Sequence, residues 1–282
     1  MQIAASIEPR SGFSGIPLAF GQVIYRVNEN SLKQVYIIGI SHRSAETGQN
    51  GSNTVKTQAD IFRIGEWLSH NRELQLLLPE GYFTAKVNYC PPTVLGLPAG
   101  LLDNSLLEKK LADESRFVNA EMLLKENCQI HVSQVEDRDL YDTVYSSLLS
   151  LQSTDTSQSP QERLSRLQYL QELRAAVLLQ KISEIIDREL NSGEIKNRSA
   201  MFTIGLNHIQ DFVRYFQSNK IQIETPPSAP RQLANVQSEV NLLKTGYGVT
   251  IIIPRTLADD QKLLQLTNLD QILLASDNRG VN

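Results

Sequence analysis

The chain has 282 residues and a formal net charge of −4, and 41% of its residues are hydrophobic while 21% are charged. This length allows one large α/β domain or two small ones, and the composition is that of an ordinary soluble globular protein. The sequence contains no basic stripe with interleaved aromatic residues, so we expect no nucleic-acid partner.

The sequence also bears on location. It contains no apolar run behind a basic N-terminal start and no stretch of about 18 apolar residues. We therefore expect no secretory signal, no membrane span and a cytoplasmic location. The two cysteines, Cys90 and Cys128, have neither metal-site spacing nor the pattern of a disulfide framework, so we expect reduced thiols.

The N-terminal third begins with an irregular lead-in over residues 1–17, which contain two prolines and two glycines. Residues 22–27 alternate in polarity, residues 28–31 are turn formers, and residues 34–40 are mostly apolar. This order predicts an N-terminal β-hairpin whose second strand is central in a sheet.

Strands and helices then alternate along the chain. The apolar runs predict further strands over residues 74–78, 129–135, 200–204 and 249–253. The helical periodicity and caps predict helices over residues 54–71, 103–114, 116–127, 138–150, 161–190, 208–217 and 258–275, with a short helix ending at 244 and a Pro-rich loop and linker over 226–238. The alternation predicts a single α/β domain over residues 1–282, with a mixed, mainly parallel sheet and helices on both faces.

Two Gly-x-x-His motifs follow predicted strands, and they carry the main functional signal. Gly39–His42 ends the second strand, Gly205–His208 ends the strand over 200–204, and Glu80 follows the strand over 74–78. Ligands bind at the carboxyl ends of parallel strands, and each glycine would let the backbone turn sharply there. Two imidazoles and a carboxylate suit a divalent metal of the Mn, Co or Zn type, which could lower the pKa of bound water.

Each of these residues also has a structural interpretation. A single histidine after a strand is more often a turn residue than a functional one, and Glu80 alone would be a surface acid. Glu136 and Asp137 follow the strand over 129–135 and could bind substrate, or they could serve the N-terminus of the next helix. Tyr82 could stabilise an oxyanion or line the pocket, and Arg198 could bind substrate or remain solvated.

The ordered set of motifs resembles the superfamily that groups the TraB/PrgY proteins, the TIKI metalloproteases, the haem-binding ChaN-like lipoproteins and the erythromycin esterases. Its hallmark is an early strand ending in Gly-x-x-His, a Glu after the next strand, and a late strand ending in Gly-x-x-His. The matching residues are Gly39-Ile-Ser-His42, Glu80 in Leu78-Pro-Glu-Gly81, and Gly205-Leu-Asn-His208. The resemblance spans roughly residues 20–254 as order and motif rather than continuous identity. It implies a metal-dependent hydrolase with His42, Glu80 and His208 as catalytic and metal-binding residues.

Members of this superfamily tend to carry an arginine on the helical stretch well before the second motif. Arg174 or Arg188 on the long predicted helix could fill this place, whereas Arg198 lies close to Gly205. The substrate stays open among peptides, esters and lactones. The alternatives are a non-enzymatic haem or small-ligand binding protein, and an interaction protein with an inactive site whose long helix could form a homodimer contact.

Overall fold

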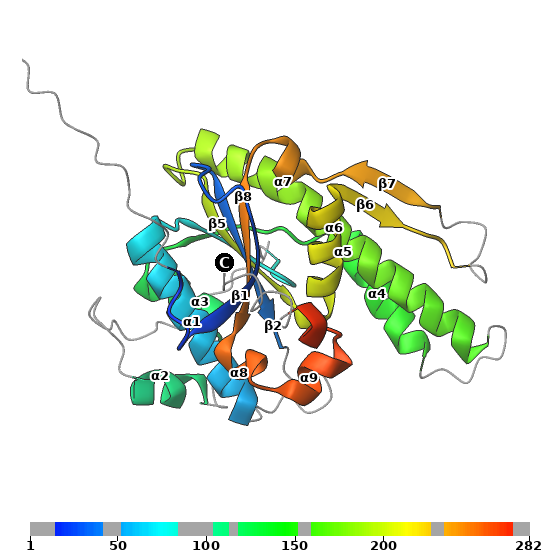
Figure 1. Ribbon diagram of the computed structural model, residues 1–282, viewed down its shortest axis with the longest axis horizontal. Coiled ribbons are helices and arrows are strands. Elements are labelled where there is room, and N and C mark those ends of the chain that lie inside the picture. The colour runs from blue at the N-terminus through cyan, green and yellow to red at the C-terminus, as the bar shows by residue number, and fades with distance from the viewer. Residues whose placement is uncertain are drawn as a thin grey trace, which may run out of the picture.

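The computed structural model describes residues 15–41, 52–83, 104–112, 118–151, 159–226 and 234–272. These residues build a six-stranded sheet with the strand order β1-β8-β2-β5-β3-β4 (Figure 1). β1 is antiparallel to β8, and every other neighbouring pair is parallel. The predicted mixed, mainly parallel α/β sheet is confirmed. The strands are β1 (Gly21–Val27), β2 (Gln34–Ile40), β3 (Leu76–Pro79), β4 (His131–Val132), β5 (Ser199–Gly205) and β8 (Gly248–Pro254).

Helices cover both faces of the sheet (Figure 1). Successive residues of a strand point to opposite faces, so β2 contributes to two cores. Val35 and Ile37 pack with α5 (Pro160–Asn191) and α6 (Ile209–Ser218). Tyr36 and Ile38 pack with α1, α2 and α3. These last three helices span Ser52–Arg72, Asn104–Leu111 and Ala120–Asn127.

The N-terminal hairpin is split by another strand. β1 and β2 run in opposite directions across a short turn, as expected, but β8 lies between them and bonds to both. β8 is buried along its whole length, which suits an interior position better than an edge. The turn is fixed to the start of β8, because Ser31 Oγ donates to Gly246 O (2.7 Å) and Gly248 N donates to Lys33 O (2.8 Å).

β4 is shorter than the strand predicted over residues 129–135. His131 N donates to Gln75 O (2.9 Å) and Ser133 N donates to Leu77 O (3.1 Å). Continuing this ladder requires a backbone N–H at position 79, and Pro79 has none. The strand pairing therefore stops, and the chain beyond Ser133 is free to bend toward the carboxyl edge of the sheet.

The prediction of one continuous terminal helix over residues 258–275 is wrong. The structure has α8 (Arg255–Ala258) and α9 (Gln261–Leu266) in its place. Asp260 starts a new helix by accepting a hydrogen bond from Leu263 N (3.1 Å), and Asn268 has a left-handed φ of 53° that ends it. Helical backbone resumes at Asp270, and the residues beyond 272 lie outside the described part of the chain.

A small second sheet lies beside α6. It pairs β6 (Lys220–Ile223) with β7 (Val236–Glu239) in antiparallel register. β7 falls at the end of the segment expected to be a Pro-rich loop over 226–238, so the loop is shorter than expected. The remaining helices are α4 (Arg138–Ser150), α7 (Asn241–Lys244) and the 3₁₀ helix η1 (Leu206–His208).

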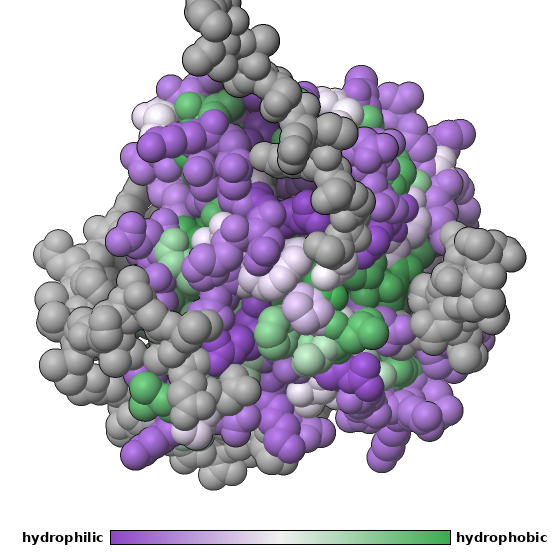
Figure 2. Space-filling view, turned by 60° about the vertical axis from the view of Figure 1, so that its left-hand side comes forward, coloured by the Kyte–Doolittle hydropathy of each residue, from purple (hydrophilic) through white to green (hydrophobic). Residues whose placement is uncertain are grey.

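The surface is mixed in character. Hydrophilic residues cover most of the face seen in Figure 2, and hydrophobic residues gather near its middle. Within the described ranges, no helix combines the length and the apolar composition needed to cross a membrane.

Candidate functional site

A buried ion triad lies at the carboxyl edge of the sheet. Arg174, in the middle of α5, donates from Nη1 to Glu80 Oε1 (2.7 Å) and from Nε to Glu136 Oε1 (2.9 Å). A second bond joins its Nη2 to Glu136 Oε2. The side chains are 8%, 5% and 0% exposed for Arg174, Glu80 and Glu136, so the charges compensate one another away from water. Burial lowers the pKa of Arg174, but hydrogen bonds and charges of Glu136 and Glu80 outweigh it and raise that pKa above its usual range.

Glu80 connects this triad to the second Gly-x-x-His motif. Its Oε2 accepts a hydrogen bond from Gly205 N (2.5 Å), and its own backbone N donates to Thr203 O (3.0 Å). Gly205 opens η1, which ends at the half-buried His208 directly before α6. The structure therefore brings Glu80 to the turn that carries His208.

Glu136 holds the turn on the other side of Glu80. Its Oε2 accepts a hydrogen bond from Gly81 N (2.9 Å), where Gly81 has a positive φ of 71°. Such a backbone conformation favours glycine. One carboxylate thus fixes both the guanidinium of Arg174 and the chain just after Glu80.

The glycines of the two motifs are not explained by sharp turns, which corrects the expectation from the sequence. Gly205 has a φ of −51°, which any residue can adopt, and Gly39 is not among the positive-φ glycines of the described chain. A Cβ on Gly39 would lie 2.9 Å from Leu206 Cδ1 and 3.1 Å from Ile209 Cγ1. Because Gly39 has no side chain, Leu206 and Ile209 of the second motif's segment can pack against the end of β2.

His42 lies outside the described residues, and Ser41 is the last one before it. β2 and β5 are parallel neighbours in register up to the pair Ile40 and Gly205. Adjacent strands lie about 4.8 Å apart, so β2 and β5 end side by side and at the same level. A site shared by His42 and His208 stays a prediction.

Glu80 and His208 are the described residues of the predicted metal site. Among the residues that can be described, no three His, Cys, Asp or Glu side chains form a metal-binding group, so a set that includes Glu80 and His208 would need a ligand from outside these residues, such as His42. Glu80 Oε1 accepts a hydrogen bond from Arg174 and Oε2 accepts one from Gly205, and a carboxylate offers about four lone-pair positions for hydrogen bonds or a metal ion. With both carboxylates ionised, the triad carries one net negative charge. These features fit a divalent cation beside Glu80 and His208.

Asp137 serves the helix that follows it. It caps α4 by accepting a hydrogen bond from Leu140 N (3.1 Å), and it pairs with Lys181 Nζ at 2.7 Å. The hydrogen bond from Lys181, followed by that from Leu140, holds the pKa of Asp137 below its usual range. The capping interpretation is confirmed for Asp137, whereas Glu136 belongs to the triad.

The two other predicted substrate-binding residues lie apart from the triad. Arg198 precedes β5, at the opposite end of that strand from Gly205, and it pairs with Asp187 at 2.9 Å. Tyr82 is half-buried just past Gly81, and its backbone N donates to Pro79 O (3.3 Å). Tyr82 is near enough in sequence to Glu80 to line the site, while Arg198 does not contact it.

Of the two arginines left open on the long helix, Arg174 is the one that contacts Glu80. Arg188 is exposed and pairs with Glu189 near the start of β4. A signal for this choice is present in the sequence, because Arg174 falls four residues after Leu170 and four before Leu178, on the buried stripe of the helix. An arginine on an apolar stripe needs a buried partner.

Sequence reasoning missed an aromatic stack beside the triad. The Tyr141 ring lies 5.3 Å from Arg174 Cζ, and the Phe83 ring meets Tyr141 edge to face at 5.1 Å. Arg138 Cζ lies over the Phe83 ring of this stack, 4.1 Å from the ring centroid. The stack joins the buried guanidinium of Arg174 to the exposed side chain of Arg138.

Buried charge of this kind occurs at catalytic sites and in structural ion-pair networks alike. Here it lies at the carboxyl edge of a mainly parallel sheet, where ligands of α/β proteins bind. No protein-family model, curated protein or solved structure matches the chain.

Proposed function

We propose that this protein is a metal-dependent hydrolase that uses water to cleave a peptide, ester or lactone bond at the carboxyl edge of the sheet. The observation that carries the proposal is the hydrogen bond from Gly205 N to Glu80 Oε2 (2.5 Å). It couples the acid after β3 to the turn that carries His208. β3 and β5 are neighbours in the sheet, and this bond adds a side-chain contact between their carboxyl ends.

In this proposal, His42 and His208 hold a divalent metal of the Mn, Co or Zn type. Glu80 is either the third ligand or the group that positions the turn of His208, and its bonds to Arg174 and Gly205 support the positioning role. The metal, when bound, lowers the pKa of water and polarises the substrate carbonyl. In the alternative arrangement one of the two histidines does not bind the metal, and it would accept the proton of the attacking water and return it to the leaving group.

Arg174 supplies a positive charge and fixed hydrogen-bond donors to the site. A guanidinium has five N–H donors, and three of those of Arg174 bond to Glu80 and Glu136. Its other two N–H groups make no hydrogen bond to the residues that the structure describes, and the Arg174 side chain is buried. Donors held in place there can stabilise the negative charge that develops on a carbonyl oxygen.

The proposal is tested on the purified full-length protein. Metal content is measured by mass spectrometry for the wild type, H42A, H208A and H70A, together with hydrolysis of a panel of esters, amides and lactones. His70 is the matched control, because it lies on α1 and its ring contacts the Glu66 carbonyl of its own helix (2.8 Å). We expect about one metal per chain in the wild type and H70A, and at least a tenfold loss of metal and activity in H42A and H208A.

A different result would replace the proposal. If the wild type binds no added Mn²⁺, Co²⁺ or Zn²⁺, and neither H42A nor H208A alters any hydrolysis found, the hydrolase proposal fails. A Soret band on haem titration that disappears in H42A or H208A would instead identify the haem-binding alternative.

A further inference from the structure

A groove of about 790 Å³ runs between the edge strand β4 and helix α5. One wall is residues 131–136, which are consecutive in sequence. Side chains of an extended chain alternate between two faces, so a hollow that contacts all six of them lies along the backbone edge itself. The other wall is a single stripe of α5, formed by Lys181, Glu184, Ile185, Arg188 and Glu189.

The backbone at this edge has unused hydrogen-bonding groups. Among the described strands, β4 pairs with β3 alone. The N–H groups of His131 and Ser133 point toward β3, where they bond to Gln75 O and Leu77 O. The N–H and C=O of Val132 therefore point the opposite way, toward the groove. An edge of this kind is a template for another strand.

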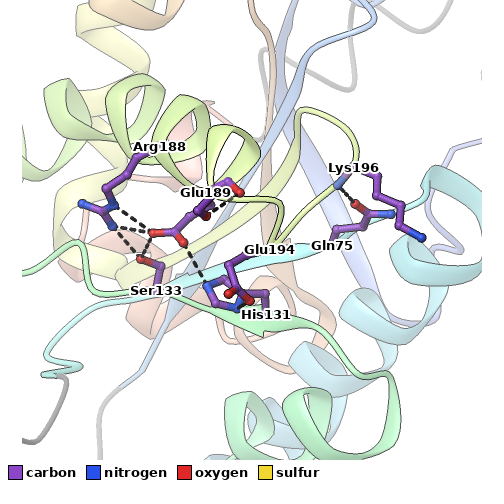
Figure 3. A network of polar contacts seen from close by, with 8 residues as sticks. Gln75, His131, Ser133, Arg188, Glu189, Glu194 and Lys196 are labelled. Carbon is purple, nitrogen blue, oxygen red and sulfur yellow. Dashed lines mark hydrogen bonds and ion pairs between the residues drawn. The ribbon is translucent and has the colours of Figure 1, made fainter.

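Side-chain contacts fix the width of the groove (Figure 3). Glu189 of α5 accepts a hydrogen bond from Ser133 Oγ (2.8 Å) and contacts His131 Nε2 at 3.1 Å. Arg188 Nη2 also donates to Ser133 Oγ (2.9 Å). These contacts connect the C-terminal end of α5 to β4 and to Ser133 just after it. A ligand therefore does not have to order the two walls before it binds.

The far end of the groove reaches the triad. Glu136 lines the groove and is also the partner of Arg174 and of Gly81 N. A segment lying along residues 131–136 would thus lead directly to the carboxyl edge of the sheet. The groove therefore ends beside the residue whose carboxylate belongs to the triad.

The charged side chains on the α5 wall of the groove differ in whether they have an ion-pair partner. Lys181 pairs with Asp137 (2.7 Å), and Arg188 pairs with Glu189 (2.6 Å). Glu184 is exposed midway along the stripe, and it forms no ion pair with the described residues. The charge left for a ligand at the middle of the groove is therefore negative.

We propose that this groove binds an extended peptide as an added strand beside β4, with a basic side chain of the peptide opposite Glu184. This mode uses backbone hydrogen bonds for affinity and side-chain positions for specificity. β4 is a strand over two residues only, and residues 131–136 would span at most about 20 Å, so the groove receives a segment of at most about six residues. The inference rests on the proposed hydrolase and makes its substrate a polypeptide rather than a small ester or lactone.

The test uses random decapeptides displayed on phage and selected against the full-length protein. Enriched peptides are synthesised with fluorescein, and their Kd is measured by polarisation with the wild type, V132P, V132T and E184K. Proline removes the outward N–H, which an edge strand tolerates, while threonine keeps it as the matched control. We expect about a tenfold higher Kd with V132P and less than a twofold change with V132T. Enriched peptides should carry Lys or Arg, and E184K should weaken them about threefold.

Alternate N-methylation of the peptides gives a second measurement that leaves the protein unchanged, and it should also raise Kd about tenfold. The proposal is overturned if no peptide is enriched over an unrelated protein, or if N-methylation leaves Kd unchanged. E80Q separates the two proposals, because it alters the triad and leaves the groove intact. Peptides that bind wild type and E80Q equally, in a protein without metal or hydrolysis, would support the groove and refute the hydrolase.

Discussion

Arg174 and Glu136 meet at two points in the interior, with Nε 2.9 Å from Oε1 and a second bond between Nη2 and Oε2. The planar fork of a guanidinium matches a carboxylate in this geometry, and a lysine could not reproduce it. Because Glu80 shares the same guanidinium, one positive charge stabilises two buried carboxylates. The triad therefore depends on Arg174 more than on either acid.

Replacing Arg174 with methionine should destabilise the fold by about 3–5 kcal/mol, because Glu80 and Glu136 would remain buried without a partner. The free energy of unfolding is measured by urea denaturation. R198M is the control, since Arg198 and Asp187 form an exposed pair that is expected to contribute less than about 1 kcal/mol. A loss below about 1 kcal/mol for R174M would show that the triad is not a buried network.

The parts of the fold that were predictable depend on local sequence. The apolar run of β8 indicates a buried strand, and the periodicity of α5 indicates a long helix with one buried stripe. The structure adds a local reason for where α5 begins, a capping box between Ser159 and Glu162. Such signals lie within a few residues of each other, so they can be recognised without the rest of the chain.

The parts that were missed depend on partners far away in sequence. β8 enters between β1 and β2 from more than 200 positions away, and no local pattern marks that insertion. The break between α8 and α9 is an exception, because its signal is local: Asp260 caps a new helix by accepting a hydrogen bond from Leu263 N. In the site, the order of motifs indicated Glu80 and His208, and the apolar stripe of α5 carries Arg174, but the pairing of Arg174 with Glu136 depends on a helix and a loop that lie far apart in sequence.

Substituting Gly39 with alanine should cost about 1–3 kcal/mol through overpacking. The new Cβ would lie 2.9 Å from Leu206 Cδ1 and 3.1 Å from Ile209 Cγ1 and Ile253 Cδ1. Urea denaturation measures the loss. If the segment around His208 packs on Gly39 as described, G39A should also reduce any hydrolytic activity.

A double-mutant cycle identifies the contact responsible. L206A removes the atom nearest to the new Cβ, so G39A and L206A together should cost at least about 0.5 kcal/mol less than the sum of the single losses. Strict additivity would mean that Leu206 is not what excludes a side chain at position 39. The presence of glycine at position 39 would then need another explanation.

Asp211, in the first turn of α6, should make the stability depend on pH. Burial, followed by the charge of Glu172, raises the pKa of Asp211 to about 6, against the lowering effect of Arg214. Arg214 Nη2 bonds to both acids, at 2.8 Å to Asp211 and 2.6 Å to Glu172. Because the folded state holds this proton more tightly than the unfolded chain, ionised Asp211 destabilises the fold.

The sign follows from proton linkage. Below about pH 4 the carboxyl is protonated in both states and costs nothing, between about pH 4 and 6 stability falls, and above about pH 6 the cost is complete. The stability of D211N relative to the wild type should therefore rise by about 2 kcal/mol from pH 4 to pH 7. Urea midpoints at four pH values measure this, with exposed Asp142 replaced by asparagine as the control. A difference that stays constant with pH would contradict the prediction.

Tyr141 supports the triad through its ring, which lies 5.3 Å from Arg174 Cζ and packs edge to face on Phe83 at 5.1 Å. No described residue forms a hydrogen bond with its hydroxyl. Y141F should therefore leave stability unchanged within about 0.5 kcal/mol, whereas Y141L should lose about 1–2 kcal/mol with the cation–π and aromatic contacts.

Urea denaturation of these two variants separates the ring from the hydroxyl, because each is compared with the same wild type. Coupling to the triad is then tested in the R174M background, where the cation is absent. Y141L should cost about 1 kcal/mol less there than in the wild type, since only the contact with Phe83 remains to be lost. An equal cost in both backgrounds would show that Tyr141 packs beside Arg174 without stabilising its charge, and the aromatic stack would then have no electrostatic part in the site.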